Sequence, residues 1–141
     1  MPPSKKVDDD WHAVMRERVA ECLQRTGVVH GAIGEVPAWE VFPMVSLWAI
    51  ESGKAPGWIG WWVIAGDCPT DYVSCTGDRT PRSAIEQISV RWGEAAEALA
   101  RGEQHPDFSV GNAGAAIELA PLLAARSETL RQYAIDDNVW D

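Results

Sequence analysis

The alternation of hydrophobic and polar positions predicts a helix in the first part of the chain. Apolar side chains recur there at helical spacing: Trp11, Met15, Val19 and Cys22. The aspartates at 8–10 can cap a helix N-terminus, and Gly27 stands at the position typical of a left-handed C-cap. We therefore expect a helix from about Asp9 to Arg25. Residues 28–37, which contain glycines and a proline, are expected to be irregular.

The middle of the chain is a long apolar stretch that predicts two strands joined by a hairpin. Met44–Glu51 is expected to be the first strand, and Pro43 before it indicates an edge or a break. Because the apolar run has no clean period of two, a short helix beginning at Pro43 is the alternative. Residues 52–57 have the composition of a turn. Trp58–Ala65 is apolar on both faces, which is typical of a central, covered strand.

The second half of the chain predicts a third short strand at Tyr72–Thr76 and then a regular helix. Thr80 can cap this helix, and Pro81 is tolerated at its first position. Apolar residues follow at helical spacing until Gly102 ends the run: Ile85, Ile88, Trp92, Ala95, Ala96 and Leu99. Gly93 inside the helix costs about 1 kcal/mol relative to alanine, which indicates the close approach of another segment.

A final helix is expected to begin near Asn112. Pro121 inside it removes an amide and clashes with the preceding turn, so we expect a kink or a division, with the longer part at Pro121–Ile135. Together these elements predict an α+β fold, a small antiparallel sheet of two or three strands packed against three helices. Residues 1–8 are expected to form a flexible leader and residues 9–141 a single domain.

The charge of the chain narrows the kinds of partner. Acidic side chains number 21 and basic side chains 12, which gives a net charge of −9. Repulsion disfavours nucleic acid and anionic membranes and favours a protein partner with a basic surface. No stretch approaches the ~20 apolar residues of a membrane span. The basic residues near the N-terminus are not followed by the apolar run of a signal peptide.

The three cysteines are odd in number and widely spaced: Cys22, Cys68 and Cys75. This pattern fits neither a disulfide framework nor paired zinc ligands, so we expect a reduced cytoplasmic protein without metal or cofactor. His30, in the glycine-containing loop, and His105 have no second ligand at the spacing that metal sites use. Cys68 lacks a sequence neighbour that would favour its thiolate, which argues against a nucleophilic role.

Residues 66–72, Gly-Asp-Cys-Pro-Thr-Asp-Tyr, are expected to form an acidic turn and are the first candidate site. In such a turn Asp67 and Asp71 lie near each other, where two carboxylates can bind a metal or transfer protons. The structural alternative is that they accept backbone amides or pair with Arg79 or Arg82.

Three further observations extend this candidate site. Glu51 ends an apolar run, where burial can raise a carboxyl pKa, although such a residue can also reach the surface and pair with Lys54. Tyr72 is expected in the core, with its hydroxyl anchored in the same network. Arg79 and Arg82 flank the start of a helix, where free amides favour an anion, but local acids are the simpler partners.

Four of the eight tryptophans cluster in the central stretch: Trp48, Trp58, Trp61 and Trp62. They cannot all point to one side of a hairpin, so one or two are expected to cover a second face or to stand exposed. Trp58 and Trp61 are therefore candidates for an aromatic interface, and Trp62 is expected in the core of the central strand.

Three strings of the chain resemble a small bacterial family of unknown function: Trp48-Ala49-Ile50-Glu51-Ser52, Gly60-Trp61-Trp62-Val63-Ile64 and Gly66-Asp67-Cys68-Pro69-Thr70-Asp71-Tyr72. Pro81-Arg82 follows them, and the resemblance covers nearly the whole chain. The family carries no established reaction. The resemblance therefore implies a single-domain bacterial protein and assigns no catalytic residue.

These observations support two classes of function. The first is an acidic binding protein, such as an inhibitor or immunity-type partner that masks a basic surface. Its contact residues would be Asp67, Asp71, Tyr72, Arg79, Arg82, Trp58 and Trp61. The second is a small hydrolase or transferase that uses Glu51, Asp67, Asp71 and Tyr72. A deep pocket collecting these four side chains would favour the enzyme, whereas exposed aromatics favour the binding protein, which we prefer.

Overall fold

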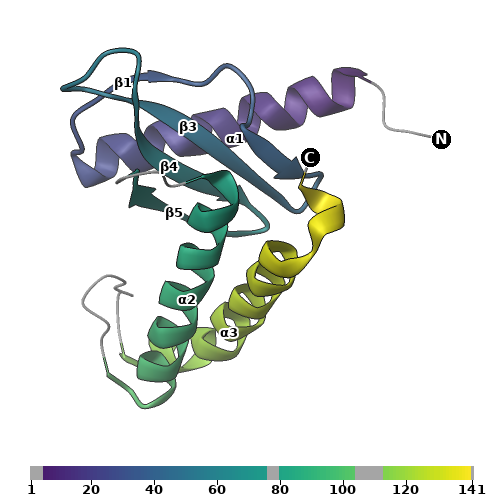
Figure 1. Cartoon of the computed structure of the whole chain (residues 1–141). Coiled ribbons are helices and arrows are strands. Elements are labelled where there is room, and N and C mark those ends of the chain that lie inside the picture. The colour runs from purple at the N-terminus through teal and green to yellow at the C-terminus, as the bar shows by residue number, and fades with distance from the viewer. Residues whose placement is uncertain (1–4, 76–79, 104–112, 141) are drawn as a thin grey trace. The chain divides into compact units, whose positions relative to one another are not determined.

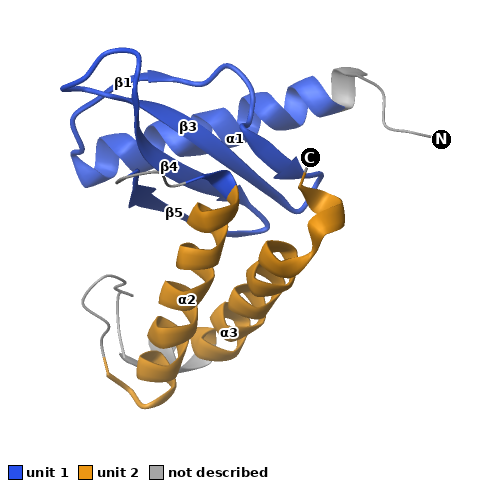
Figure 2. Ribbon diagram, viewed as in Figure 1, with its two compact units in different colours: residues 1–81 blue, residues 82–141 orange. Residues whose placement is uncertain are grey.

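The computed structural model describes residues 5–75, 80–103 and 113–140. These residues form three α-helices, a short 3-10 helix and one antiparallel sheet of five strands. The fold is therefore α+β, with more strands than the two or three expected. The chain divides into two compact units, Met1–Pro81 and Arg82–Asp141 (Figure 2). The first holds the sheet and one helix, and the second holds a helical hairpin.

Helix α1 spans Lys5–Thr26 and lies across one face of the sheet (Figure 1). It begins before the expected Asp9, so the last part of the expected leader is helical, and residues 1–4 lie outside the described residues. Its end matches the prediction. The Thr26 hydroxyl donates to the Cys22 carbonyl at 2.8 Å, and Gly27 adopts a φ of +72° as a left-handed cap.

The sheet has the strand order β1-β3-β4-β5, with β2 also paired to β3. All of these pairings are antiparallel. The strands are β1 (His30–Ile33), β2 (Trp39–Val41), β3 (Val45–Ser52), β4 (Ile59–Gly66) and β5 (Cys68–Ser74). The predicted hairpin is confirmed as β3 and β4, and the alternative of a short helix beginning at Pro43 is wrong.

Two other predictions for this region need correction. Residues 28–37 were expected to be irregular, yet β1 forms there, because a short glycine-containing segment gains its order by pairing with β3. The expected acidic turn at 66–72 is also mostly a strand, since only Asp67 separates β4 from β5. Asp, Pro and Thr are typical turn residues. Pro69 is tolerated because β5 lies at the sheet edge, paired only to β4 among the described strands.

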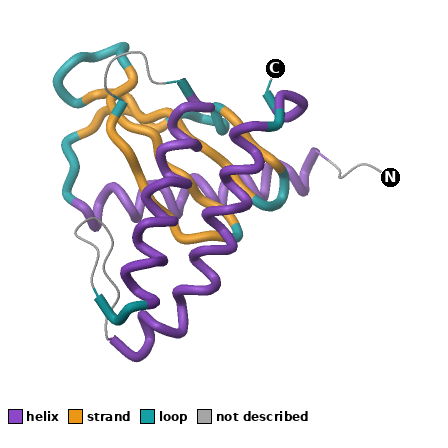
Figure 3. Tube along the Cα trace, turned by 60° about the horizontal axis from the view of Figure 1, so that its bottom comes forward, coloured by secondary structure: helices purple, strands orange, loops and turns teal. Residues whose placement is uncertain are grey.

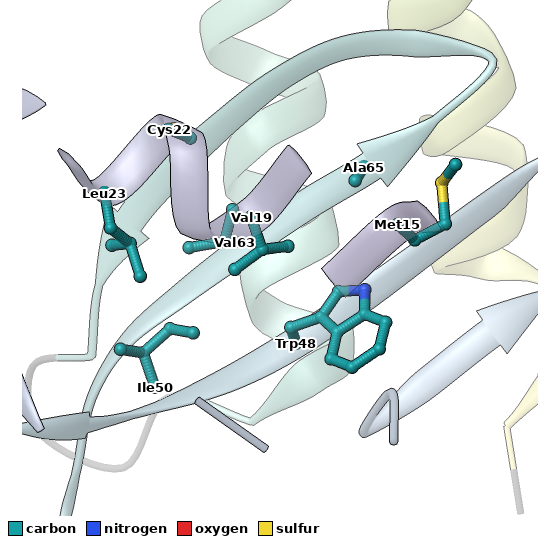
Figure 4. Close-up of a cluster of buried hydrophobic side chains, with 8 residues drawn as sticks. All are labelled: Met15, Val19, Cys22, Leu23, Trp48, Ile50, Val63 and Ala65. Carbon is teal, nitrogen blue, oxygen red and sulfur yellow. The ribbon is translucent and has the colours of Figure 1, made fainter. Parts of the chain in front are cut away.

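The core of the first unit lies between α1 and one face of the sheet (Figure 4). Eight buried side chains meet there: Met15, Val19, Cys22 and Leu23 from the helix, and Trp48, Ile50, Val63 and Ala65 from β3 and β4. The strand residues occupy alternate positions, as a period of two requires. Each large side chain of this kind contributes about 1.5–3 kcal/mol on full burial.

Trp48 is the largest fully buried side chain of this core, and its polar atom is satisfied. Its indole N–H donates to Ser46 Oγ at 2.9 Å, and the Ser46 hydroxyl donates to the Ala65 carbonyl at 2.7 Å. The indole N–H of this buried tryptophan therefore has a hydrogen-bond acceptor.

Residues on the opposite face of the central strands are buried as well, namely Leu47, Trp62 and Ile64. Burial on both faces explains why these strands show no hydrophobic alternation. The core position predicted for Trp62 is confirmed, since its side chain is 3 % exposed. Its indole N–H has no hydrogen-bond partner among the described residues.

The second unit contains α2 (Pro81–Ala100), α3 (Ala113–Ile135) and the 3-10 helix η1 (Asp137–Val139). Helices α2 and α3 run side by side in Figure 1 and Figure 3. The predicted limits of α2 are confirmed, and α3 continues through Pro121 instead of being divided there. None of the described helices is long and apolar enough to cross a membrane.

The close approach of another segment that was predicted at Gly93 is confirmed, and the segment is α3. A Cβ there would lie 3.1 Å from Ser127 Oγ of α3, and the Ser127 hydroxyl donates to the Ser89 carbonyl at 2.6 Å. The absence of a side chain at position 93 therefore lets α3 approach α2 closely.

Candidate functional site

The acidic residues of the first candidate site are arranged along an edge strand. Asp67 is exposed, and its backbone amide donates to the Met44 carbonyl at 2.8 Å. Asp71 is half-buried, and its carboxylate accepts the Tyr72 backbone amide at 2.8 Å. The Asp71 carboxylate thus has a backbone amide as one partner, which is the kind of contact that the structural alternative predicted.

The four side chains of the enzyme hypothesis do not converge on one point. Glu51 pairs with Ile59 at the first residue of β4, whereas Asp67 follows the last residue of the same strand. An eight-residue strand spans about 23 Å between its end residues, so these carboxylates lie at opposite ends of the sheet. Tyr72 packs its ring on Trp61, with ring centroids 5.8 Å apart, next to the core under α1.

Glu51 has a structural role that the sequence did not predict. Its carboxylate accepts the backbone amides of Ala32 at 3.1 Å and Gly57 at 3.0 Å, so it ties β1 to the turn of the β3–β4 hairpin. A Cβ at Gly31 would overlap the same carboxylate, so a side chain there would displace Glu51 from this position. These backbone hydrogen bonds lower the pKa of Glu51, in contrast to the raised pKa considered from the sequence.

Arg82 lies in the first turn of α2 and binds residues at the end of α3 and beyond it. Its guanidinium donates to the Ala134 carbonyl and to the Asp137 carboxylate, both at 2.7 Å. It also lies over the Trp140 ring, 5.9 Å from the centroid. These contacts join the start of α2 to the residues after α3. Arg79, the other candidate cation, lies outside the described residues.

The cysteines and histidines that the structure describes are dispersed, and His105 lies outside the described residues. Cys22 is buried, and this burial raises the pKa of its thiol. Cys68 and Cys75 are half-buried, and neither forms a disulfide. His30 lies in β1 instead of a loop, and Nε2 of His12 in α1 forms a hydrogen bond of 2.7 Å with the Glu40 carboxylate. No three His, Cys, Asp or Glu side chains gather as a metal site within the described residues. That the chain binds no metal stays a prediction.

An exposed apolar surface lies at the turn of the β3–β4 hairpin. We call it the hairpin patch and define it by Val29, Ala55, Trp58, Ile59 and Trp61, which line one depression of about 530 Å³. Trp58 is 74 % exposed, Val29 68 % and Ile59 41 %. The structure therefore brings the two predicted interface tryptophans, Trp58 and Trp61, to the same surface.

Local hydrogen bonds hold this turn in place. Ser52 Oγ accepts the backbone amides of Lys54 and Ala55, both at 3.1 Å. The Ser52 amide donates to the Trp58 carbonyl at 2.8 Å, and Gly57 adopts a φ of +88°. With the Glu51 carboxylate on the Gly57 amide, the backbone of the turn is fixed while the Trp58 side chain remains in solvent.

Sequence reasoning missed Val29 and Ile59 as members of this surface. Val29 belongs to the segment expected to be irregular, and Ile59 to a strand expected to be covered on both sides. The register shift between Ile50 and Glu51 places Ile59 opposite Glu51, at the end of the hairpin, where the side chain is exposed. The available signal was a valine in a polar, glycine-containing segment directly after a helix cap.

Comparison with known proteins places the chain in a family without adding a reaction. No curated protein and no solved structure matches it. One family matches residues 6–140, nearly the whole chain, in agreement with the resemblance of the three strings. The chain belongs to that family, which is described as a domain of unknown function (DUF4826).

Proposed function

We propose that the protein is a binding protein that uses the hairpin patch to contact another protein. The observation that carries the proposal is Trp58, a tryptophan 74 % exposed on a backbone fixed by hydrogen bonds. Tryptophan is enriched among the residues that dominate binding energy at interfaces. A fixed turn also loses little conformational freedom on binding, which favours affinity.

The charge of the chain supports a basic partner. The net charge is −9, and Lys54 is the charged side chain that lines the depression beside the apolar residues. An apolar patch on an acidic protein suits a partner with an apolar contact region surrounded by lysine or arginine. Long-range attraction would then speed association, and the apolar contact would slow dissociation. An inhibitor or an immunity-type protein is one kind of binding protein with this combination.

The hydrolase or transferase alternative receives no comparable support. Glu51 is occupied by two backbone amides and lies at the opposite end of the sheet from Asp67. A carboxyl group with a lowered pKa is ionised at neutral pH, so it has no proton to donate as a general acid.

Site-specific crosslinking tests the proposal. We would replace Trp58 with the photoreactive amino acid p-benzoyl-phenylalanine, irradiate the native cells and identify the attached proteins. The matched control carries the same amino acid at Val14, an apolar residue of α1 that is 48 % exposed. We expect a basic protein attached at position 58 and not at position 14. The same products at both positions, or none at position 58, would count against the proposal.

Once the partner is purified, comparing its affinity for the wild type and for Trp58→Ala measures how much Trp58 contributes to binding. We expect Trp58→Ala to weaken binding by about 2 kcal/mol or more, which is roughly 30-fold, as for interface anchors elsewhere. Val14→Ala should change it by less than about twofold. Equal affinities for the wild type and Trp58→Ala would show that the patch is not the contact surface.

A further inference from the structure

A second recessed surface runs between the helices of the second unit. We call it the helical groove. It consists of two depressions of about 490 and 540 Å³ that share Gly93, Glu97 and Ser127 and therefore adjoin. The groove follows α2 from Glu86 to Ala100, a distance of about 21 Å at the helical rise. This length matches about four turns of another helix.

The floor of the groove is made of small side chains. Gly93, Ala96 and Ala124 line it, and the hydrogen bond from Ser127 to the Ser89 carbonyl holds the two helices together beneath it. Small residues let a third helix approach towards the short end of the usual 8–10 Å interaxial distance. The backbone groups of both helices are already paired, so the groove offers no edge to an extended peptide.

The walls of the groove expose apolar surface. Val90 of α2 is 56 % exposed and Ile135 of α3 is 60 % exposed, and both line the 490 Å³ depression. Burial of these side chains by a partner would add favourable apolar contact.

The rim of the groove is acidic. Exposed Glu86 and Glu97 line it, and neither forms an ion pair with a described residue. Glu94 lies between them on the same face of α2. The guanidinium of Arg131 donates two hydrogen bonds of 2.9 and 2.8 Å to the Glu128 carboxylate. The positive charge of Arg131 is therefore balanced by Glu128, and the other glutamates keep the rim negative. Two copies of such a rim would repel each other, which disfavours self-association through the groove.

We propose that the helical groove binds a basic amphipathic helix of a partner protein. Its apolar stripe would lie on the floor between Val90 and Ile135, and lysines or arginines beside the stripe would meet Glu86 and Glu97. The proposal does not depend on the hairpin patch, because the groove and the patch have no residue in common.

The test uses the full chain and a defined probe. The probe is a 15-residue helical peptide with leucines at i, i+3, i+4 and i+7 and lysines at the other positions. The comparison peptide has glutamate in place of lysine. We expect fluorescence anisotropy to show binding of the lysine peptide alone, with backbone amide shifts in solution NMR confined to the residues of the groove. Binding of both peptides, or shifts spread over the whole chain, would overturn the proposal.

A pair of double variants separates the groove from general attraction to an acidic protein. Glu86→Gln with Glu97→Gln should weaken binding of the lysine peptide about tenfold at low salt. Glu17→Gln with Glu21→Gln changes the net charge equally on exposed positions of α1, and should weaken it by less than about twofold. Equal losses in the two double variants would show non-specific attraction and would overturn the proposal.

A second pair of variants tests the shape of the groove. Ala124→Phe fills the floor and should abolish binding, whereas Ala125→Phe, an equally exposed neighbour that does not line the groove, should preserve it. Thermal melts of both variants check folding. Wild-type affinity in Ala124→Phe would overturn the proposal, and so would a wild-type dimer in sedimentation equilibrium that Ala124→Phe dissociates.

Discussion

The hairpin patch and the helical groove are both recessed surfaces, yet their chemistry differs. The patch is built from large apolar side chains around Trp58 on a fixed turn, and the groove from small side chains with an acidic rim. Large apolar contacts mainly lengthen the life of a complex, whereas charged rims mainly speed its formation and make it sensitive to salt. The two proposed contacts would therefore differ in lifetime and in sensitivity to salt.

The largest expected effect is the difference in stability between a tryptophan variant in the core and one in the hairpin patch. Trp48→Ala removes a fully buried tryptophan and should lower the free energy of unfolding by about 3–5 kcal/mol. Trp58→Ala removes an exposed one and should change it by no more than about 0.5 kcal/mol. Chemical denaturation of both variants measures the difference. A strong destabilisation by Trp58→Ala would mean that the patch is part of the core.

The next effect tests how closely the helices of the groove approach each other. Gly93→Leu forces a side chain against Ser127 at a cost of about 1–3 kcal/mol, which the gain of about 1 kcal/mol in helix propensity offsets only in part. Ala100→Leu places the same side chain on an exposed position of the same groove and should cost less than about 0.5 kcal/mol. Thermal denaturation of the two variants compares them directly. Equal stability would show that Gly93 is not a point of close contact.

A smaller effect is expected from Glu51→Gln, which should make the backbone of the hairpin turn more mobile and leave the helices of the groove unchanged. Glu51→Gln weakens the bonds to the Ala32 and Gly57 amides, so these amides should exchange faster with solvent while those of α2 do not change. Because folding lowers the pKa of Glu51, its stabilisation should be complete above its ordinary value near 4.5 and disappear as the pH falls below it. Glu35→Gln, at an exposed carboxylate of the same unit, is the control, and equal exchange in both variants would contradict the assignment.

The smallest effect concerns the ion pair beside the groove. Hydrogen bonds from Arg131 and then Gln132 lower the pKa of Glu128 to about 2. The pair should therefore stabilise the fold above pH 4.5 and lose this contribution between 4.5 and about 2. The loss should be small, because the pair is exposed to solvent. Acid titration of stability for Glu128→Gln and Glu86→Gln measures it, and identical curves would mean that the pair contributes nothing.

The sequence predicted the elements whose limits are marked by local chemistry. Helix α2 begins at Pro81 and is followed by Gly102 with a φ of +76°, and both signals are visible in the chain. The β3–β4 hairpin was predicted because its turn residues separate two apolar runs. The sequence could not reveal β1 and β2, because strands of four and three residues acquire their order from β3. The start of β5 was hidden by turn-forming residues that an edge strand accepts.

The candidate surfaces were predictable only where surplus side chains marked them. Trp58 was found because four neighbouring tryptophans exceed what one face of a hairpin can bury. Val29 was not, because its neighbours come from the distant hairpin turn. The groove was missed for a similar reason. Glu86 and Val90 share a face of α2, but the sequence does not show which face α3 leaves open.

Arg82 joins the start of α2 to the end of α3 through Ala134, Asp137 and Trp140. The start of α2 is thus tied to the end of α3, and this end of the groove is preorganised before any partner arrives. A partner helix that is disordered in isolation would then bear nearly all of the ordering entropy of association itself, so its own helical propensity would set the affinity.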